Sequence, residues 1–210
     1  MAVFDTEFTL VKRAIDSVLN QTFQDFELIV IDDGSHIDAS RSLLAYTSQN
    51  DHKISYLRHQ NCGQSQSINR GVALSKGAYI TILDSDDEYK PGHLSSCLRE
   101  MQFSDLIAST TETVVDHDDH YYVPDRHNVQ ELIHVDECIL FATLFGKKEV
   151  FSEFAFHGAY AADAHFYERA RQKYMVRKVD LRTYVYYRNI PNSACVRMRQ
   201  DQLLRIAEPN

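Results

Sequence analysis

A short apolar run that ends on a cluster of acids constrains this chain more than any other feature. Residues 80–83 are apolar and rich in β-branched side chains, and Asp84, Asp86 and Asp87 follow directly. Such a run predicts a buried strand. Three carboxylates within four positions repel one another, and their hard oxygen atoms suit Mg²⁺ or Mn²⁺. An acidic turn that caps the next helix is the alternative, because Asp is common in turns.

The composition excludes several classes of protein. A chain of 210 residues with 44% hydrophobic residues is long enough for one α/β domain. Lys and Arg number 22 against 30 Asp and Glu, so the formal net charge of −8 argues against a nucleic-acid groove. The four cysteines form no CxxC pair, which indicates neither a zinc site nor a disulfide framework.

The hydropathy pattern also bears on location. No run approaches the ~18 apolar residues of a membrane span, and no basic segment followed by an apolar one opens the chain. We therefore expect a cytoplasmic protein, with peripheral attachment at the inner face of the membrane left open.

Helical and strand patterns alternate through the first half of the chain. The spacing of apolar side chains predicts helices at 6–20, 40–48 and 64–76. Strands are expected at 26–31, 54–57 and 80–83. This alternation is typical of a doubly wound α/β sheet with mostly parallel strands, flanked by helices, that carries its ligands at the carboxyl edge.

A second acid is expected at that same edge. The strand at 26–31 runs into Asp32, Asp33 and Gly34, where glycine permits a sharp turn and Asp33 can extend its carboxylate across the edge. Neither GxGxxG nor GxxxxGKS/T occurs in the chain, so a glycine-rich phosphate loop is absent. Two acidic strand ends without such a loop favour a metal at Asp86 as the group that neutralises phosphate.

Three segments together resemble a known enzyme family. They are residues 13–35, the loop from Asn61 to Gln64, and residues 77–87 with their Asp84-Ser85-Asp86-Asp87 motif. In order, spacing and residue type they resemble the inverting glycosyltransferases of family 2, which have the GT-A fold. The resemblance implies one GT-A domain over residues 1–210, with a nucleotide-binding part at 1–115 and an acceptor-binding part at 116–210.

The resemblance implies a site for a nucleotide-sugar donor, with a UDP-sugar favoured. Phe4 is expected to stack on the base, and Asp5 takes the place of the family's Asn. Asp33 is expected to bind the base, and Asn69 to lie near base and ribose. Ile68 replaces the Arg that commonly precedes this Asn, for which Arg70 is a substitute.

The acidic motif receives its roles from the same resemblance. Asp84 and Ser85 are expected at the ribose or the metal shell, and Asp86 is the expected direct ligand of the Mg²⁺ or Mn²⁺ that bridges the diphosphate. Farther along the chain, Arg188 and Ser193 fall in a segment that resembles the family's region near the diphosphate.

The second half is expected to supply a catalytic base. Asp163 falls where the family has its basic Asp, although Ala162 replaces the Glu that usually precedes it. A carboxylate there can remove the proton of an acceptor hydroxyl as that hydroxyl attacks the anomeric carbon. A simple helix-capping role for Asp163 is the alternative. The nearby His/Asp run at 116–120 is interpreted as a solvated loop, because its residues are adjacent rather than at ligand spacing.

The remaining elements are less sharply patterned. Strands are expected at 106–115, 175–179 and 183–188, and a helix at 136–144. The apolar run before Asp5 is short for the first strand of this fold, so we expect residues 1–4 to form only a truncated first strand.

The combined prediction is a metal-dependent inverting glycosyltransferase that acts on a saccharide or lipid-linked saccharide acceptor in polysaccharide or glycoconjugate synthesis. A phosphatase with an Asp-x-Asp motif is disfavoured because Glu88 stands where Thr or Val is needed. A nucleotidyltransferase is disfavoured by the absent glycine-rich loop. A catalytically impaired nucleotide-binding remnant, or a partner subunit of a glycosyltransferase, stays open as an alternative.

Overall fold

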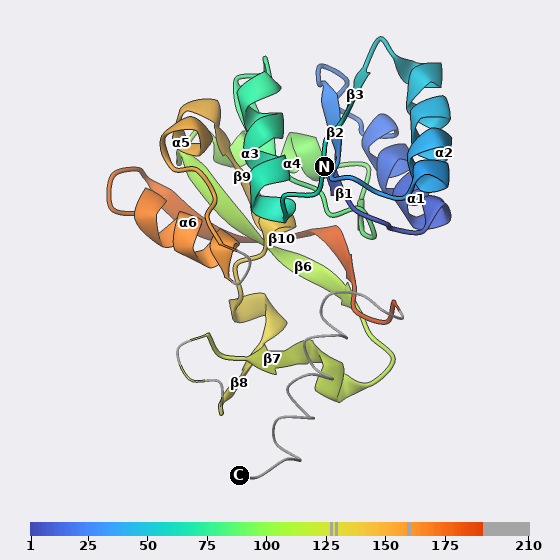
Figure 1. The fold of residues 1–210 in the computed structure, drawn as a ribbon. Helices are drawn as coiled ribbons and strands as arrows, with labels where there is room; N and C mark the ends of the chain where they lie inside the picture. The colour runs from blue at the N-terminus through green and yellow to red at the C-terminus, as the bar shows by residue number, and fades with distance from the viewer. Residues whose placement is uncertain (127, 129, 159–160, 191–210) are drawn as a thin grey trace.

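A computed structural model of the chain describes residues 1–126, 128, 130–158 and 161–190 (Figure 1). Its strands are β1 (Ala2–Val3), β2 (Leu28–Asp32), β3 (Ile54–Arg58), β4 (Tyr79–Thr81), β5 (Glu88–Tyr89), β6 (Leu106–Val114), β7 (Tyr122–Pro124), β8 (Leu132–His134), β9 (Leu144–Lys147) and β10 (Val176–Tyr187). Its α-helices are α1 (Phe8–Leu19), α2 (Ile37–Thr47), α3 (Gln64–Leu74), α4 (His93–Glu100), α5 (Lys148–Glu153) and α6 (Ala162–Ala170). Short 3₁₀ turns are η1 (Ser48–Asn50), η2 (Asp118–Tyr121), η3 (Val135–Glu137) and η4 (Phe141–Thr143).

The first sheet has the expected parallel arrangement. Its strands stand in the order β1-β2-β3, and both pairs are parallel. In Figure 1, α1 and α2 lie on one side of this sheet and α3 on the other. Four apolar residues spaced along one face of α1 are buried in the core that the helix shares with β2: Val11, Ala14, Ile15 and Val18. The alternating pattern of the sequence thus predicts this sheet correctly, whereas the strand expected at 80–83 is β4 of the second sheet.

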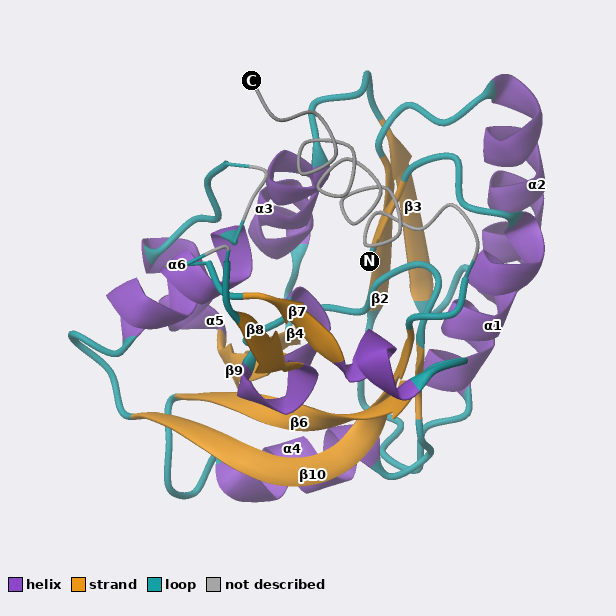
Figure 2. Ribbon diagram, turned by 90° about the horizontal axis from the view of Figure 1, so that it is seen from below, coloured by secondary structure: helices purple, strands orange, loops and turns teal. Residues whose placement is uncertain are grey.

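The second sheet is mixed rather than mostly parallel. Its order is β4-β9-β6-β10-β5, with β6 and β10 parallel and the other pairs antiparallel. The chain reaches β9 from β6 through the small β7–β8 hairpin and turns, not through a helical crossover, so β9 returns antiparallel. Figure 2 shows β6 and β10 as two long curved strands side by side, with α4 against them.

Two expectations for the second half are wrong. The helix expected at 136–144 is instead η3, an extended link, η4 and the first residue of β9. Phe141, Ala142, Thr143 and Leu144 are all buried in succession, whereas a surface helix buries one face. The two strands expected at 175–179 and 183–188 are one strand, β10, whose register with β6 shifts between residues 179 and 184.

An apolar cavity of about 590 Å³ lies between β2 and β4, the latter an edge strand of the second sheet. β1 pairs with β2 only through Ala2 and Val3, opposite Ile31 and Asp32. Neither Asp33 nor any acid of the Asp84–Asp87 motif lines the cavity, so it is separate from the chemistry described below. No helix in the described part of the chain combines the length and the hydrophobicity needed to cross a membrane.

Candidate active site

The carboxylates of Asp84 and Asp86 lie close enough to interact, and the N-terminal amine acts on the first and Arg13 on the second. The carboxylate of Asp84 accepts a hydrogen bond from Nε2 of Gln64 at 2.8 Å. Burial, with the nearby carboxylates of Asp86 and Asp163, raises the pKa of Asp84 to about 7. Burial also raises the pKa of Asp86, against the opposing charge of Arg13. Ionised carboxylates in such a place are stabilised by a cation.

The third acid of the motif has a different task. Asp87 is buried, and its carboxylate accepts hydrogen bonds from the hydroxyl of Tyr184 and, at 2.7 Å, from the backbone N–H of Tyr187. These hydrogen bonds hold the end of β10 next to the acidic motif. Ser85 is buried as well, and its Oγ lies 2.7 Å from Oγ1 of Thr6, just before α1. The nucleotide contact predicted for Ser85 stays a prediction.

Arg13 is a residue of this region that the sequence interpretation did not single out. Its guanidinium donates to the backbone carbonyl of Asp86 and lies 3.8 Å from the ring centroid of Tyr187. It links α1, the acidic motif and β10. No local spacing in the sequence identifies it, because its partners are 73 and more residues away along the chain.

Asp33 lies at the end of β2, as predicted, and the loop from Asn61 to Gln64 surrounds it. The backbone N–H groups of Cys62 and Gly63 donate to its two oxygens at 2.8 and 2.9 Å, and Nδ2 of Asn61 is 3.2 Å away. Since Gln64 of the same loop holds Asp84, this short loop joins the two acidic strand ends into one region. The two strand ends are near each other, but the prediction of one edge of one sheet is wrong, because β2 belongs to the first sheet and β4 to the second.

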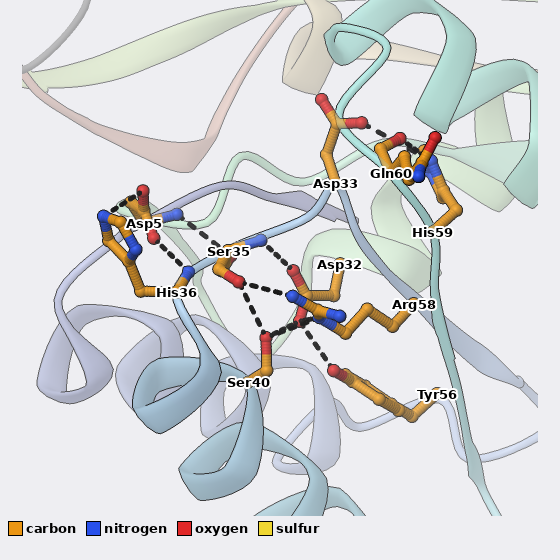
Figure 3. A network of polar contacts seen from close by, with 10 residues as sticks. All are labelled: Asp5, Asp32, Asp33, Ser35, His36, Ser40, Tyr56, Arg58, His59 and Gln60. Carbon is orange, nitrogen blue, oxygen red and sulfur yellow. Dashed lines mark hydrogen bonds and ion pairs between the residues drawn. The ribbon is translucent and has the colours of Figure 1, made fainter.

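Asp32, next to Asp33, is the centre of a buried network that the sequence interpretation missed (Figure 3). Its carboxylate accepts from the backbone N–H of Ser35, the hydroxyl of Ser40 and the hydroxyl of Tyr56 at 2.6–2.8 Å. Burial alone would raise its pKa, but these hydrogen bonds hold the pKa below the ordinary value. The consecutive Asp pair at the strand end was the available signal, and it does not tell which Asp turns inward.

Phe4 and Asp5 follow β1 at the edge of the same region. Phe4 is 52% exposed, so its ring is accessible to a planar ligand. Asp5 accepts a hydrogen bond from the backbone N–H of His36 at 2.7 Å, and its own N–H donates to Oγ of Ser35. These contacts place both residues beside the turn after β2, as Figure 3 shows for Asp5. Their roles toward a base stay predictions.

Asn69 has a use that competes with its predicted contact to a nucleotide. Its Nδ2 donates to the carbonyl of Phe156 and its Oδ1 accepts from the N–H of the same residue, both at 2.8 Å. This pair of bonds ties α3 to the segment that leads to α6. Arg70, the suggested substitute for the missing Arg, is exposed on α3.

Asp163 lies in the first turn of α6, and its Oδ1 is 2.8 Å from the N–H of Ala164. Burial raises its pKa to about 6, in spite of hydrogen bonds from backbone N–H groups. Asp163 comes from the other half of the chain, yet its charge is close enough to raise the pKa of Asp84. Asp163 and Asp84 therefore lie near enough to interact electrostatically, and the role of Asp163 as a base stays a prediction.

Three further predictions concern the run at 116–120, Arg188 and Ser193. The run at 116–120 leads into η2, and His117, Asp118 and Asp119 are exposed, which agrees with a solvated turn. The guanidinium of Arg188 lies 5.7 Å from the ring centroid of Tyr186. Ser193 lies outside the described residues.

Comparisons with known proteins identify the family. The model of Glycosyl transferase family 2 matches residues 3–170. A Campylobacter jejuni protein named GalNAc(5)-diNAcBac-PP-undecaprenol beta-1,3-glucosyltransferase is 37% identical over 93 residues, which are 43% of this chain and 30% of that protein. Glycosyltransferase GlyG of Streptococcus pneumoniae is 34% identical over 104 residues, 49% of this chain and 34% of that protein. Among the first curated relatives, the matched region spans between 13% and 49% of the relative's length.

Solved structures show the same fold at low sequence identity. The mannosyltransferase PcManGT of Pyrobaculum calidifontis, in complex with GDP-Man and Mn²⁺, has a TM-score of 0.72 at 13% identity and covers 100% of this chain and 63% of that one. TarS 1–349 of S. aureus in complex with UDP has a TM-score of 0.69 at 16% identity, with 89% and 58% covered. The resemblance predicted from the motifs is confirmed. The chain belongs to glycosyl transferase family 2 and has the GT-A fold.

Proposed function

We propose that this protein is an inverting glycosyltransferase that takes a sugar from a nucleotide-diphosphate donor, with a UDP-sugar favoured, and transfers it to an acceptor hydroxyl. One observation carries the proposal. The carboxylate of Asp163, from the second half of the chain, is within electrostatic reach of Asp84, from the first half. A carboxylate that can help to hold a metal ion for the leaving diphosphate and a carboxylate that can activate an acceptor therefore share one region. Similar structures were solved with UDP, UDP-GlcNAc and GDP-Man.

The residues of the acidic motif fit a hard divalent ion. Their donor atoms are oxygens, which Mg²⁺ and Mn²⁺ prefer, and burial with mutual repulsion raises the pKa of Asp84, while burial raises that of Asp86. Asp86 would hold the ion, with Asp84 beside it. When bound, the ion would neutralise the charge that develops on the departing diphosphate.

Asp163 would act as the general base. A pKa of about 6 leaves its carboxylate ionised at neutral pH and still able to accept a proton from the acceptor hydroxyl. The hydroxyl oxygen would then attack the anomeric carbon on the face opposite the diphosphate, so that the configuration at that carbon inverts. Arg126, whose positive charge lowers the pKa of Asp163, would keep the carboxylate ionised before the acceptor arrives.

The acceptor is proposed to be a saccharide or a lipid-linked saccharide in polysaccharide or glycoconjugate synthesis. The name of the Campylobacter relative describes transfer to a saccharide on undecaprenyl diphosphate. An acceptor of that kind would place the protein in the cytoplasm at the inner face of the membrane. A second candidate function is that of an impaired nucleotide-binding subunit, and Asn69 favours it, because both ends of its amide bond to Phe156.

Calorimetric titration of UDP, with and without Mn²⁺, tests the donor site. We expect binding that needs Mn²⁺ and that is lost in Asp86→Ala. Asp118→Ala, which removes an exposed acid of η2, is the matched control and should bind as the wild type does. Metal-independent binding, or equal binding by Asp86→Ala, would overturn the assignment of the metal ligand. Sugar transfer from a panel of UDP-sugars would then separate the enzyme from the impaired subunit.

A further inference from the structure

A second group of metal-binding side chains, chemically unlike the first, lies at the end of β2. Asp33, His59 and Cys62 each offer one ligand atom, and these atoms lie within 4.8 Å of one another. Nδ1 of His59 is 3.4 Å from Sγ of Cys62 and 3.6 Å from Oδ1 of Asp33. Figure 3 shows the side chains of Asp33 and His59 on facing segments. The cluster joins a carboxylate, an imidazole and a thiol.

These separations suit a tetrahedral metal centre. With Zn–S bonds of about 2.3 Å and Zn–N bonds of about 2.0–2.1 Å, a sulfur and a nitrogen ligand lie about 3.5 Å apart. A nitrogen and an oxygen ligand of the same centre lie about 3.4 Å apart. The distances of 3.4 and 3.6 Å around His59 differ from these values by no more than about 0.2 Å, and the third pair, Sγ of Cys62 and the carboxylate of Asp33, lies within 4.8 Å.

The backbone holds the carboxylate in position. Gly34 has a φ of 82°, and a Cβ at this position would lie 2.7 Å from the backbone nitrogen of Asn61. Glycine therefore lets the turn after Asp33 approach the loop that carries the other two ligands. The N–H groups of Cys62 and Gly63 then fix both oxygens of Asp33. Hydrogen bonds of this kind orient a ligand side chain before an ion binds.

The histidine and the cysteine are also suitably placed. Nε2 of His59 lies 3.1 Å from Oγ of Ser67, and an Nε2–H that donates to this hydroxyl leaves the lone pair of Nδ1 for a metal. In the structure Nδ1 lies 2.7 Å from the carbonyl of Gln60, which can only accept, so binding would require the proton to move to Nε2 and this contact to break. Cys62 is exposed, so an ion at this cluster would be accessible from solvent.

We propose that Asp33, His59 and Cys62 bind a divalent cation of the Zn²⁺ class through one carboxylate oxygen, one imidazole nitrogen and one thiolate. Binding releases the thiol proton to solvent. The thiolate separates this site from Asp84 and Asp86, whose ligand atoms are all oxygen. A search for cysteine pairs finds no such site, because the ligands follow a His-x-x-Cys spacing and the third comes from another strand. The inference goes beyond the proposed sugar transfer, and since Asp33 is also the residue expected to bind the base, the ion and a nucleotide would compete for its carboxylate.

Cobalt(II) is the probe that tells the two sites apart. Co²⁺ bound to a thiolate gives a sulfur-to-metal charge-transfer absorption, whereas Co²⁺ on carboxylates and water does not. We expect this absorption to saturate at one equivalent in the purified wild-type chain and to disappear when Zn²⁺ is added. Cys62→Ser should abolish it, and His59→Ala should weaken Co²⁺ binding at least ~10-fold.

Two control variants test whether the absorption comes from this cluster. Asp86→Ala removes a ligand of the oxygen site, and Cys138→Ser removes a half-buried thiol elsewhere; both should keep the absorption. Absence of the band in the wild type, or its persistence in Cys62→Ser, would overturn the proposal. A band that is unchanged in His59→Ala and Asp33→Asn would show an isolated thiol contact and would overturn it as well.

Alkylation of the wild-type protein provides a second measurement that needs no variant. Iodoacetamide should modify the exposed Cys62, and Zn²⁺ should slow this reaction at least ~10-fold, as read from the mass of the peptide that contains it. Mg²⁺ should give no protection, because it prefers oxygen ligands. Equal rates with and without Zn²⁺ would contradict a thiolate–metal bond.

Discussion

Two acidic strand ends lie close together in this protein, and they differ in how the negative charge of their carboxylates is stabilised. At the end of β2, Asp32 has three hydrogen-bond donors at 2.6–2.8 Å and a pKa below its ordinary value. After β4, Asp84 accepts a side-chain hydrogen bond from Gln64 and has a pKa raised to about 7. The two segments look alike as sequence, since each is an apolar run followed by acids.

The difference separates a structural role from a functional one. Asp32 is satisfied by the protein itself, so it stabilises the turn and the strands around it. Asp84 and Asp86 are half-buried, and among the described residues Gln64 is the one side chain that donates a hydrogen bond to Asp84, so a bound cation would stabilise their charges. We infer that the candidate site is marked by carboxylates that have few hydrogen-bond donors among the described residues, rather than by the number of acids.

The largest effect is expected from Asp86→Ala on sugar transfer. Loss of the proposed metal ligand should lower kcat/KM by ~10²–10³-fold, because the diphosphate leaves without its counter-charge. Stability without metal should not fall, since the variant removes a repulsive charge. Steady-state kinetics with Mn²⁺ and urea denaturation without it measure the two quantities. A stable protein with unchanged kcat/KM would rule out a role for Asp86 in transfer.

The opposite pattern is expected for Asp32→Ala. The variant leaves the hydroxyl of Tyr56 and the N–H of Ser35 without their acceptor, and the hydroxyl of Ser40 with only the carbonyl of Ser35, so the free energy of unfolding should fall by ~2–3 kcal/mol. Urea denaturation measures the loss. Asp38→Ala is the matched control, because Asp38 is an exposed acid on α2 whose ion pair with Arg41 contributes little. Equal losses in both variants would remove the contrast between a satisfied and an exposed acid.

The sequence predicted the elements of the first half because their patterns are local. Apolar periodicity identified α1, β2 and β3, and the position of Asp33 at a strand end followed from the order of elements. The pairing of Asn69 with Phe156 and of Arg13 with Asp86 depends on residues far apart in the chain, which no local pattern encodes. The missed mixed sheet has the same cause, since β9 is placed by its partners rather than by a crossover helix.

A smaller effect of opposite sign is expected for Asp84→Asn. The folded-state pKa of about 7 lies above the ordinary value of 3.8, so ionisation of Asp84 costs stability as pH rises through this interval. At pH 8 without metal, the variant should unfold with a free energy ~1–2 kcal/mol higher than the wild type. At pH 4 the two proteins should differ less. Urea denaturation in EDTA at both pH values measures this, and a destabilised variant at pH 8 would contradict this cost of ionisation at the motif.

The smallest effect concerns the pH dependence of transfer. If Asp163 is the base, it works ionised, so kcat/KM should rise with pH through an apparent pKa of about 6 and be lost below it. The positive charge of Arg126 lowers this pKa, so Arg126→Gln should move the acid limb to higher pH by less than ~1 unit. Arg41→Gln, an exposed cation on α2, should leave the limb in place. A limb that moves to lower pH in Arg126→Gln, or one that persists in Asp163→Asn, would assign the base to another group. Asp163 would then have a structural role, like Asp32, through its contact with the first turn of α6. The carboxylates of Asp84 and Asp86 after β4 would then act on the donor alone.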